Sequence, residues 1–182
     1  MRPVATKSGT ITAVRVFGSL LFTTLVAASV YAQSSTEPLP AGNETAGAAI
    51  VAGKGNCQSC HRIFGRGSRL GPDLTDIGSF RTPAQLEASL LDPNAEILPE
   101  NRFYRVVTRD GAAVTGRLLN LDTFQVMLLD PKEQLRTFAK SELREHGFAD
   151  GSKMPSFRGT LSRQELADVI AYLLTLKGIT AQ

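Results

Sequence analysis

The two cysteines of this 182-residue chain, Cys57 and Cys60, lie three positions apart and are followed directly by His61, in the stretch G-N-C-Q-S-C-H-R-I. Two thiols at this spacing beside an imidazole allow four kinds of chemistry. They could form a disulfide, act as a thioredoxin-like redox pair, supply part of a zinc site, or attach a haem covalently. The rest of the sequence has to decide among these four.

The sequence context favours haem attachment. A zinc site requires four ligands, and beyond the motif only His146 or a carboxylate remains. A thioredoxin-like pair expects a βαβ context, which is missing around the motif, and a disulfide closing so small a loop stabilises little and leaves His61 unexplained. In a helix, Cys57, Cys60 and His61 would project from one face. C-x-x-C-H is the attachment signature of c-type haem.

A haem iron bound by His61 has a second axial position, for which the sequence offers Met127, His146 and Met154. Met127 lies in the strand-like segment T-F-Q-V-M-L-L, where a methionine usually fills a core. Met154 lies in the irregular segment K-M-P-S-F, where Pro155 bars a helix and stiffens the backbone beside the sulfur. We favour Met154, with His146 in the loop-like H-G-F as the alternative.

The segment L-G-P-D-L, residues 70–74, could supply a hydrogen-bond acceptor to the His61 imidazole. A ligating histidine usually donates its other ring N–H to a carbonyl or carboxylate, which fixes its tautomer. The rigid turn at Gly71-Pro72 could hold such a carbonyl. A plain turn proline is the other interpretation, and the sequence alone does not separate the two.

Helical patterns must position these residues. The first is expected from Asn43, a suitable N-cap, to Ile63, with the cysteine motif near its end. Residues 64–81 are rich in Gly and Arg and are expected to lack regular structure.

Two later helices have capping boxes at their N-termini. Thr82 and Gln85 form one box, and Ser162 and Glu165 form the other. Apolar residues recur at helical spacing in the last of these helices up to Gly178.

Between about residues 101 and 145 the pattern changes to that of β-strands. Four short segments fit this pattern: F-Y-R-V-V-T-R, A-A-V-T-G-R-L-L, T-F-Q-V-M-L-L and Q-L-R-T-F. Turn residues such as Asp110-Gly111 separate them. The sequence therefore predicts a β-meander here.

The N-terminus has the features of an export signal. Arg2, Lys7 and Arg15 precede an apolar run over residues 16–32, and cleavage is expected after Ala32. An uncleaved membrane anchor is the alternative. Residues 33–42 are expected to form a flexible leader.

The charge distribution argues against nucleic-acid binding. The chain has 20 basic and 17 acidic residues, and three of the basic ones lie in the expected signal segment. The remaining chain is therefore balanced in charge and has no basic footprint.

Four motifs in this order resemble the class I cytochromes c: C-Q-S-C-H at 57–61, L-G-P-D-L at 70–74, K-M-P-S-F at 153–157 and D-V-I-A-Y-L-L at 168–174. The resemblance covers about residues 43–99 and 147–178. It implies a mainly α cytochrome c fold over residues 43–182, with three or more helices around a haem. The segment 101–145 would interrupt this domain as a small antiparallel β-meander or barrel.

The resemblance also implies roles for individual residues. Cys57 and Cys60 would form thioether bonds to one haem c, and His61 and Met154 would be its axial ligands. Pro72 would offer its carbonyl to the His61 imidazole.

Further contacts follow from the same resemblance. The first and last helices would cross where Gly47 meets Tyr172. Because the chain has no tryptophan, haem propionates would need other partners. The candidates are Arg62, Arg66, Arg69 and Arg81.

With both axial positions occupied by protein, the iron would have no open site, and one-electron gain and loss is the reaction left to it. We therefore expect an exported, periplasmic electron carrier that cycles between Fe(III) and Fe(II), and not an enzyme. The alternative is a haem enzyme or sensor with a labile sixth ligand.

The β segment is similar to the insertion in bacterial cytochromes c found beside or fused to quinoprotein dehydrogenases. This similarity implies a quinoprotein dehydrogenase and a terminal oxidase as redox partners. A third hypothesis treats the segment as a docking module. It rests on the mixed surface charges of Arg105, Arg109, Lys132, Glu133 and Lys140.

Overall fold

The computed structural model describes residues 38–178, which belong to one compact unit. The expected signal segment, 1–32, and the first half of the expected leader lie outside the described residues. None of the helices within residues 38–178 has the length and hydrophobicity needed to cross a bilayer.

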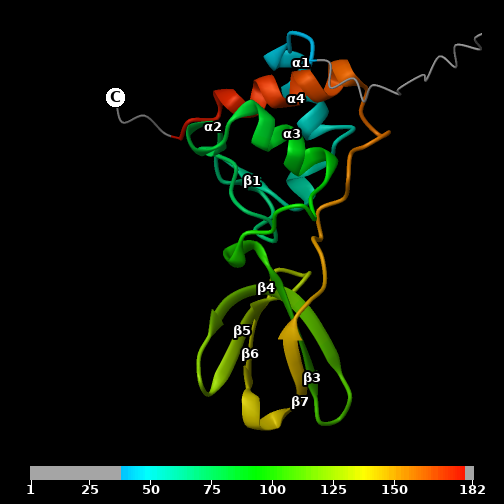
Figure 1. Cartoon of the computed structure of the whole chain (residues 1–182). Coiled ribbons are helices and arrows are strands. Elements are labelled where there is room, and N and C mark those ends of the chain that lie inside the picture. Colours follow the sequence, from blue (N-terminus) through cyan, green and yellow to red (C-terminus); the bar gives the residue numbers. More distant parts are fainter. Residues whose placement is uncertain (1–37, 179–182) are drawn as a thin grey trace, which may run out of the picture. The chain divides into compact units, whose positions relative to one another are not determined.

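Four α-helices and three short 3₁₀ helices occur in the described residues (Figure 1). The α-helices are α1 (Glu44–Ala52), α2 (Ile77–Phe80), α3 (Pro83–Leu91) and α4 (Arg163–Thr175), and the 3₁₀ helices are Cys57–Ser59, Pro99–Asn101 and Lys140–Glu142. Helices α1, α3 and α4 supply most of one apolar core, which includes Val51, Leu86, Leu90 and Val169. Ile63, in the short strand β1 (Arg62–Ile63), and Phe157, in the loop before α4, complete this core.

Helices α1 and α4 touch backbone to backbone at Gly47. A Cβ atom at this position would lie 2.0 Å from the Asp168 carbonyl oxygen and 2.8 Å from the Tyr172 Cβ. Only glycine lets the two helices approach so closely. The expected meeting of Gly47 and Tyr172 is therefore present in the structure.

Both predicted capping boxes are confirmed. The Thr82 Oγ1 accepts from the Gln85 N–H while the Gln85 Oε1 accepts from the Thr82 N–H, and Pro83 occupies the first turn. Ser162 and Glu165 make the same reciprocal pair at the start of α4. The last helix ends at Thr175, earlier than predicted.

The prediction of one helix over residues 43–63 is wrong. Helix α1 begins as expected, with Asn43 as N-cap, but ends at Ala52. The next residues, G-K-G-N, disfavour a helix because glycine has the greatest backbone freedom to lose. Asn56 then adopts a left-handed conformation, with φ of 45°, and a separate 3₁₀ turn starts at Cys57.

The segment 64–81 is more regular than predicted. Strands β1 (Arg62–Ile63) and β2 (Arg66–Gly67) form a small antiparallel ladder, and helix α2 follows. Phe64 and Gly65 turn the chain between these strands, both with positive φ. Such short elements have no periodicity that a sequence pattern could reveal.

Five antiparallel strands form a separate sheet. They are β3 (Phe103–Thr108), β4 (Ala113–Leu121), β5 (Gln125–Leu129), β6 (Leu135–Ala139) and β7 (Leu143–Phe148), in the order β6-β5-β4-β3-β7. The first four are the predicted meander. The fifth was missed because its sequence, L-R-E-H-G-F, is mostly polar and mostly exposed. Instead of pairing with β6, strand β7 returns to pair with β3.

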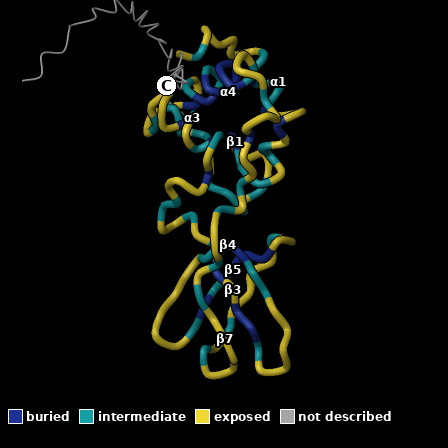
Figure 2. The backbone as a smooth tube through the Cα atoms, turned by 45° about the vertical axis from the view of Figure 1, so that its right-hand side comes forward, coloured by how far each residue is buried: buried dark blue, intermediate teal, exposed yellow. Residues whose placement is uncertain are grey.

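The prediction of a mainly α fold is wrong. The described residues are 31% helical and 26% strand, so the sheet is nearly as large a part of the chain as the helices. The sheet also has its own apolar core, formed by Tyr104, Val106, Val126 and Leu128. Figure 2 shows these buried positions on the inner strands and a second buried group at α1 and α4.

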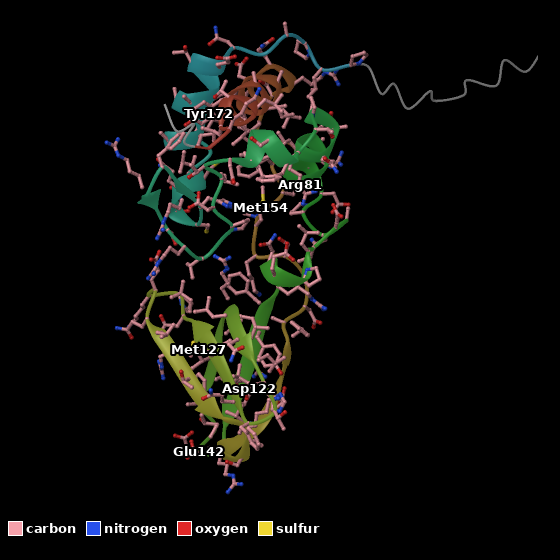
Figure 3. All side chains as sticks on the ribbon, turned by 90° about the vertical axis from the view of Figure 1, so that its left-hand side faces the viewer. Arg81, Asp122, Met127, Glu142, Met154 and Tyr172 are labelled. Carbon is pink, nitrogen blue, oxygen red and sulfur yellow. The ribbon has the colours of Figure 1, made fainter. Side chains whose placement is uncertain are left out.

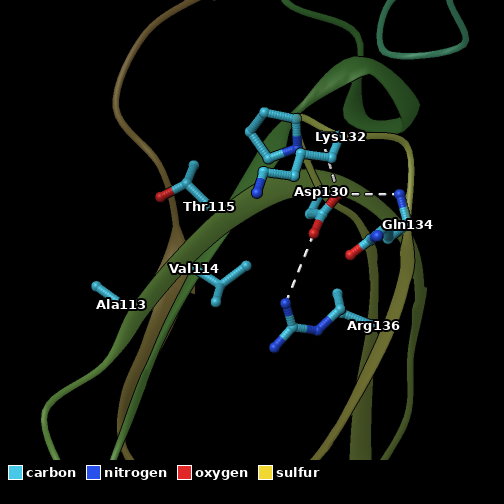
Figure 4. Close-up of a pocket in the computed structure, with 8 residues that line it drawn as sticks. Ala113, Val114, Thr115, Asp130, Lys132, Gln134 and Arg136 are labelled. Carbon is cyan, nitrogen blue, oxygen red and sulfur yellow. Dashed lines mark hydrogen bonds and ion pairs between the residues drawn. The ribbon is translucent and has the colours of Figure 1, made fainter.

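Asp130 shapes the turn between β5 and β6 (Figure 4). Its Oδ1 accepts from the N–H groups of Lys132 and Gln134, both at 2.9 Å, and its Oδ2 lies 3.6 Å from Arg136 Nη1. These bonds, the one from Gln134 first, hold the pKa of the Asp130 carboxyl below its ordinary value. The charged form is therefore part of the folded turn.

Asp130→Asn is expected to make stability less dependent on acid. A carboxyl with a depressed pKa in the folded state stabilises the fold above its unfolded value, about 3.9, and this contribution is lost as pH falls through the folded pKa. Thermal unfolding between pH 7 and pH 3 measures the effect. The wild-type midpoint should fall more steeply below about pH 4 than that of the variant. The exposed Asp150→Asn is the control, and identical pH profiles for wild type and Asp130→Asn would contradict the prediction.

Candidate functional site

The cysteine motif forms its own turn. The N–H groups of Cys60 and His61 both donate to the Cys57 carbonyl, at 3.1 and 2.9 Å. Cys57 and Cys60 are free, half-buried thiols, and burial raises the pKa of Cys57. One 3₁₀ turn thus brings the three residues together without the predicted α-helix.

The His61 imidazole is fixed by the segment that follows it in the chain. Its Nδ1 lies 2.8 Å from the Pro72 carbonyl oxygen. A carbonyl only accepts, so Nδ1 carries the proton and Nε2 keeps its lone pair. Burial lowers the pKa of His61, while the bond to Pro72 acts in the opposite direction. The ring is therefore held neutral with one nitrogen free to bind a metal, as a histidine ligand must be.

Gly71 lies close against this ring. A Cβ at Gly71 would be 2.8 Å from both Nδ1 and Cε1 of His61, and the Gly71 N–H donates to the Cys60 carbonyl at 2.6 Å. A side chain at this position would push the loop away from the imidazole. The sequence G-P at 71–72 thus combines close approach with a fixed carbonyl.

Met154 lies on the loop before α4 and packs against the helical core (Figure 3). The loop is tied to α3 on the C-terminal side of Met154. The Phe157 N–H donates to the Leu90 carbonyl at 2.9 Å, and the Ser156 hydroxyl donates to the Leu91 carbonyl at 2.6 Å. The sulfur is thus carried on an irregular but anchored segment.

The other two ligand candidates belong to the sheet. Met127 lies on β5 (Figure 3) and its side chain is half-buried. His146 lies on β7, where its Nδ1 is 2.8 Å from the hydroxyl of buried Tyr104. The expectation that His146 lies in a loop is wrong. Neither residue belongs to the helical core that Met154 contacts.

The four arginines have different surroundings. Arg69 pairs with Glu133 and Arg81 with Glu96, both at 3.5 Å, while Arg66 is exposed. The Arg62 Nε is buried and has no hydrogen-bond partner among residues 38–178. Buried donors are nearly always satisfied, so this one indicates a partner that residues 38–178 do not supply.

Sequence reasoning missed one residue near the imidazole. Arg117, on β4, donates from Nη1 to the carbonyl oxygens of Arg69, at 2.9 Å, and Gly71, at 3.1 Å. It lies 46 positions from Gly71 in the chain. No local pattern in T-G-R-L-L marks this contact, because it depends on the tertiary fold. In the described residues, no three or more His, Cys, Asp or Glu side chains gather as a metal-ion site.

Comparison with known families identifies the motif's context. The family model for cytochrome c matches residues 44–121. This range includes Cys57, Cys60, His61 and Pro72 and ends in β4, before Met154. A comparison with curated proteins gave no match.

The residues fit the cofactor of that family. Cytochromes c bind haem c covalently, and Cys57 and Cys60 have the spacing of its attachment motif. Both thiols are free, the His61 Nε2 keeps a lone pair, and the Arg62 Nε lacks a partner within residues 38–178. The match over residues 44–121 supports haem binding and electron transfer as the chemistry of this site.

Proposed function

Because residues 44–121 match a cytochrome c domain, we propose that this chain is an exported one-electron carrier with a single covalent haem c held axially by His61 and Met154. The observation that carries the proposal is the His61–Pro72 contact of 2.8 Å, next to two free thiols. It presents an oriented, neutral imidazole at the attachment motif.

Each residue has a distinct role in this proposal. Cys57 and Cys60 anchor the group through two thioether bonds. The Pro72 carbonyl accepts the Nδ1 proton of His61, which fixes the tautomer and strengthens Nε2 as a ligand. When bound, the haem iron supplies the Fe(III)/Fe(II) couple.

Met154 tunes that couple and closes the site. A thioether is a soft ligand that favours the reduced metal. Pro155 and the bonds from Ser156 and Phe157 to α3 restrain the loop that carries the sulfur, so Met154 would be held ready to bind the haem iron and would exclude water from it.

We place the carrier in the periplasm, between a dehydrogenase and a terminal acceptor. The export-type N-terminal sequence supports this location. The similarity of the β segment to insertions in cytochromes associated with quinoprotein dehydrogenases supports a dehydrogenase as donor. Electron uptake from a purified quinoprotein dehydrogenase, followed spectroscopically, tests the partner.

Replacing both Cys57 and Cys60 by alanine is expected to abolish covalent pigment. The variants should be made in a host that attaches c-type haem, and the protein separated by denaturing electrophoresis and stained for haem. Wild type should retain colour after acid-acetone extraction, and the double variant should lose all of it. Ser59→Ala, between the two cysteines, is the matched control and should keep its pigment. Colourless wild-type protein would refute the proposed function.

A further inference from the structure

The sheet reaches into the loop that lies against His61. The Arg117 guanidinium on β4 binds the carbonyl oxygens of Arg69 and Gly71 together. The Gly71 carbonyl belongs to the peptide bond that joins Gly71 to Pro72. Because a peptide unit is planar and stiff, holding this oxygen fixes the backbone directly before the carbonyl that His61 uses.

Glu133 holds the same loop from the turn between β5 and β6. Its Oε1 accepts from the Arg69 N–H at 3.1 Å, and its Oε2 lies 3.5 Å from the Arg69 Nε. The Arg117 guanidinium therefore donates to two carbonyl oxygens of this loop. The Glu133 carboxylate accepts from one N–H of the loop and pairs with the Arg69 side chain.

The backbone of Glu133 is fixed by the turn that carries it. Its φ is 57°, in the left-handed region that non-glycine residues seldom occupy. The turn shaped by Asp130 imposes this conformation, since the Glu133 N–H donates to the Asp130 carbonyl at 2.8 Å. Uncommon backbone conformations persist where the surroundings determine them, and they cluster at functional sites.

Arginine suits this position for a physical reason. Its guanidinium is a rigid planar donor group, so one side chain can hold two oxygens at fixed separation. A lysine carries the same charge on a flexible stem and provides no such fixed geometry. The charge of Arg117 also acts on His61, whose pKa it helps to lower.

We propose that Arg117 is a positioning residue for the His61 ligand. By holding the Gly71 carbonyl, it keeps the Pro72 carbonyl within reach of Nδ1, so a residue of the sheet tunes the reduction potential of a site in the helical part of the chain. The inference rests on the proposed function, in which His61 binds the haem iron.

Two effects of Arg117 on the potential can be separated. Its positive charge disfavours the oxidised, more positive iron and so raises the potential. Its hold on the loop strengthens the Nδ1–H bond to Pro72, which makes the imidazole a better donor to Fe(III) and lowers the potential. Arg117→Lys keeps the charge and loses the fixed geometry. Arg117→Met loses both.

The test uses the holoprotein and follows the exchange of the His61 Nδ1 proton with deuterium by NMR in the reduced state. Losing a charge-assisted anchor should speed this exchange about tenfold in Arg117→Met. In Arg117→Lys the His61 Nδ1 proton should also exchange faster. The reduction potential of this variant should rise, because the hold on the loop is lost while the positive charge is kept. Arg105→Met is the matched control. Arg105 lies on β3 in the same sheet and pairs with Glu145 at 2.9 Å, both side chains largely exposed.

The possible outcomes distinguish the claims. Exchange and potential equal to those of Arg105→Met, even with a lowered unfolding temperature, would mean a structural role only and would overturn the inference. If Arg117→Met does not fold, Arg117→Lys and Glu133→Gln carry the same test, and faster exchange in both supports the inference. Wild-type protein without covalent pigment would overturn the proposed function and this inference with it. Retained pigment with unchanged exchange would overturn the inference alone.

Discussion

Met154→Ala is expected to abolish the weak far-red absorption of sulfur-to-iron charge transfer and to lower the reduction potential. Axial ligands set haem reduction potentials over a range of about 0.8 V, so loss of a thioether ligand should lower the potential by a sizeable fraction of that range. The iron of the variant should become high-spin or bind an added small ligand. Absorption spectra of both oxidation states and a redox titration measure these changes.

The two rejected ligand candidates provide the controls for this experiment. Met127→Ala removes a sulfur from β5, and His146→Gln removes an imidazole from β7. Both variants should keep the wild-type spectrum. An unchanged far-red band in Met154→Ala, or its loss in Met127→Ala, would assign the sulfur to another residue. A five-coordinate spectrum in the wild type would instead favour the enzyme or sensor function.

Gly47→Ala is expected to destabilise the fold by about 3 kcal/mol, at the upper end of the range for overpacked cores. The new methyl group would lie 2.0 Å from the Asp168 carbonyl, a backbone atom that cannot move aside alone. Helices α1 and α4 would have to separate. Because four residues connect α1 to the cysteine motif, and the Gly55 N–H among them donates to the Ile50 carbonyl of α1, the site would loosen with the helix. Chemical denaturation followed by helical circular dichroism measures the loss.

Gly147→Ala is the matched control for this prediction. Gly147 lies on β7, and a Cβ there would meet no atom within 4 Å. Its free energy of unfolding should stay close to that of the wild type. Equal stability of Gly47→Ala and Gly147→Ala would show that the two helices are not in the close contact described.

The helix starts could be predicted because their signals are local. Thr82 with Gln85, and Ser162 with Glu165, satisfy backbone groups within four residues of themselves. The attachment motif is local in the same sense. Its spacing determines its chemistry whether the backbone is an α-helix or, as found, a 3₁₀ turn.

The errors share a different cause. Strand β7 is polar and becomes a strand only because β3 offers it a free edge. Helix α1 ends early because Gly53 and Gly55 follow it, and the sequence prediction gave these glycines too little weight. Arg117 became notable only once the fold had brought β4 to the loop before Pro72. Such contacts join residues far apart in the chain, and no window of sequence contains them.

The pairing of β3 with β7 brings the two ends of the sheet segment together. The Ala149 N–H donates to the Phe103 carbonyl at 2.9 Å, and Tyr104 lies opposite Phe148 in the ladder. Entry and exit points that are neighbours can be bridged by a very short linker at little entropic cost. The segment from Phe103 to Phe148 therefore begins and ends at neighbouring points. It could be excised, exchanged between homologous proteins or replaced by a reporter domain while the surrounding helices keep their own connections.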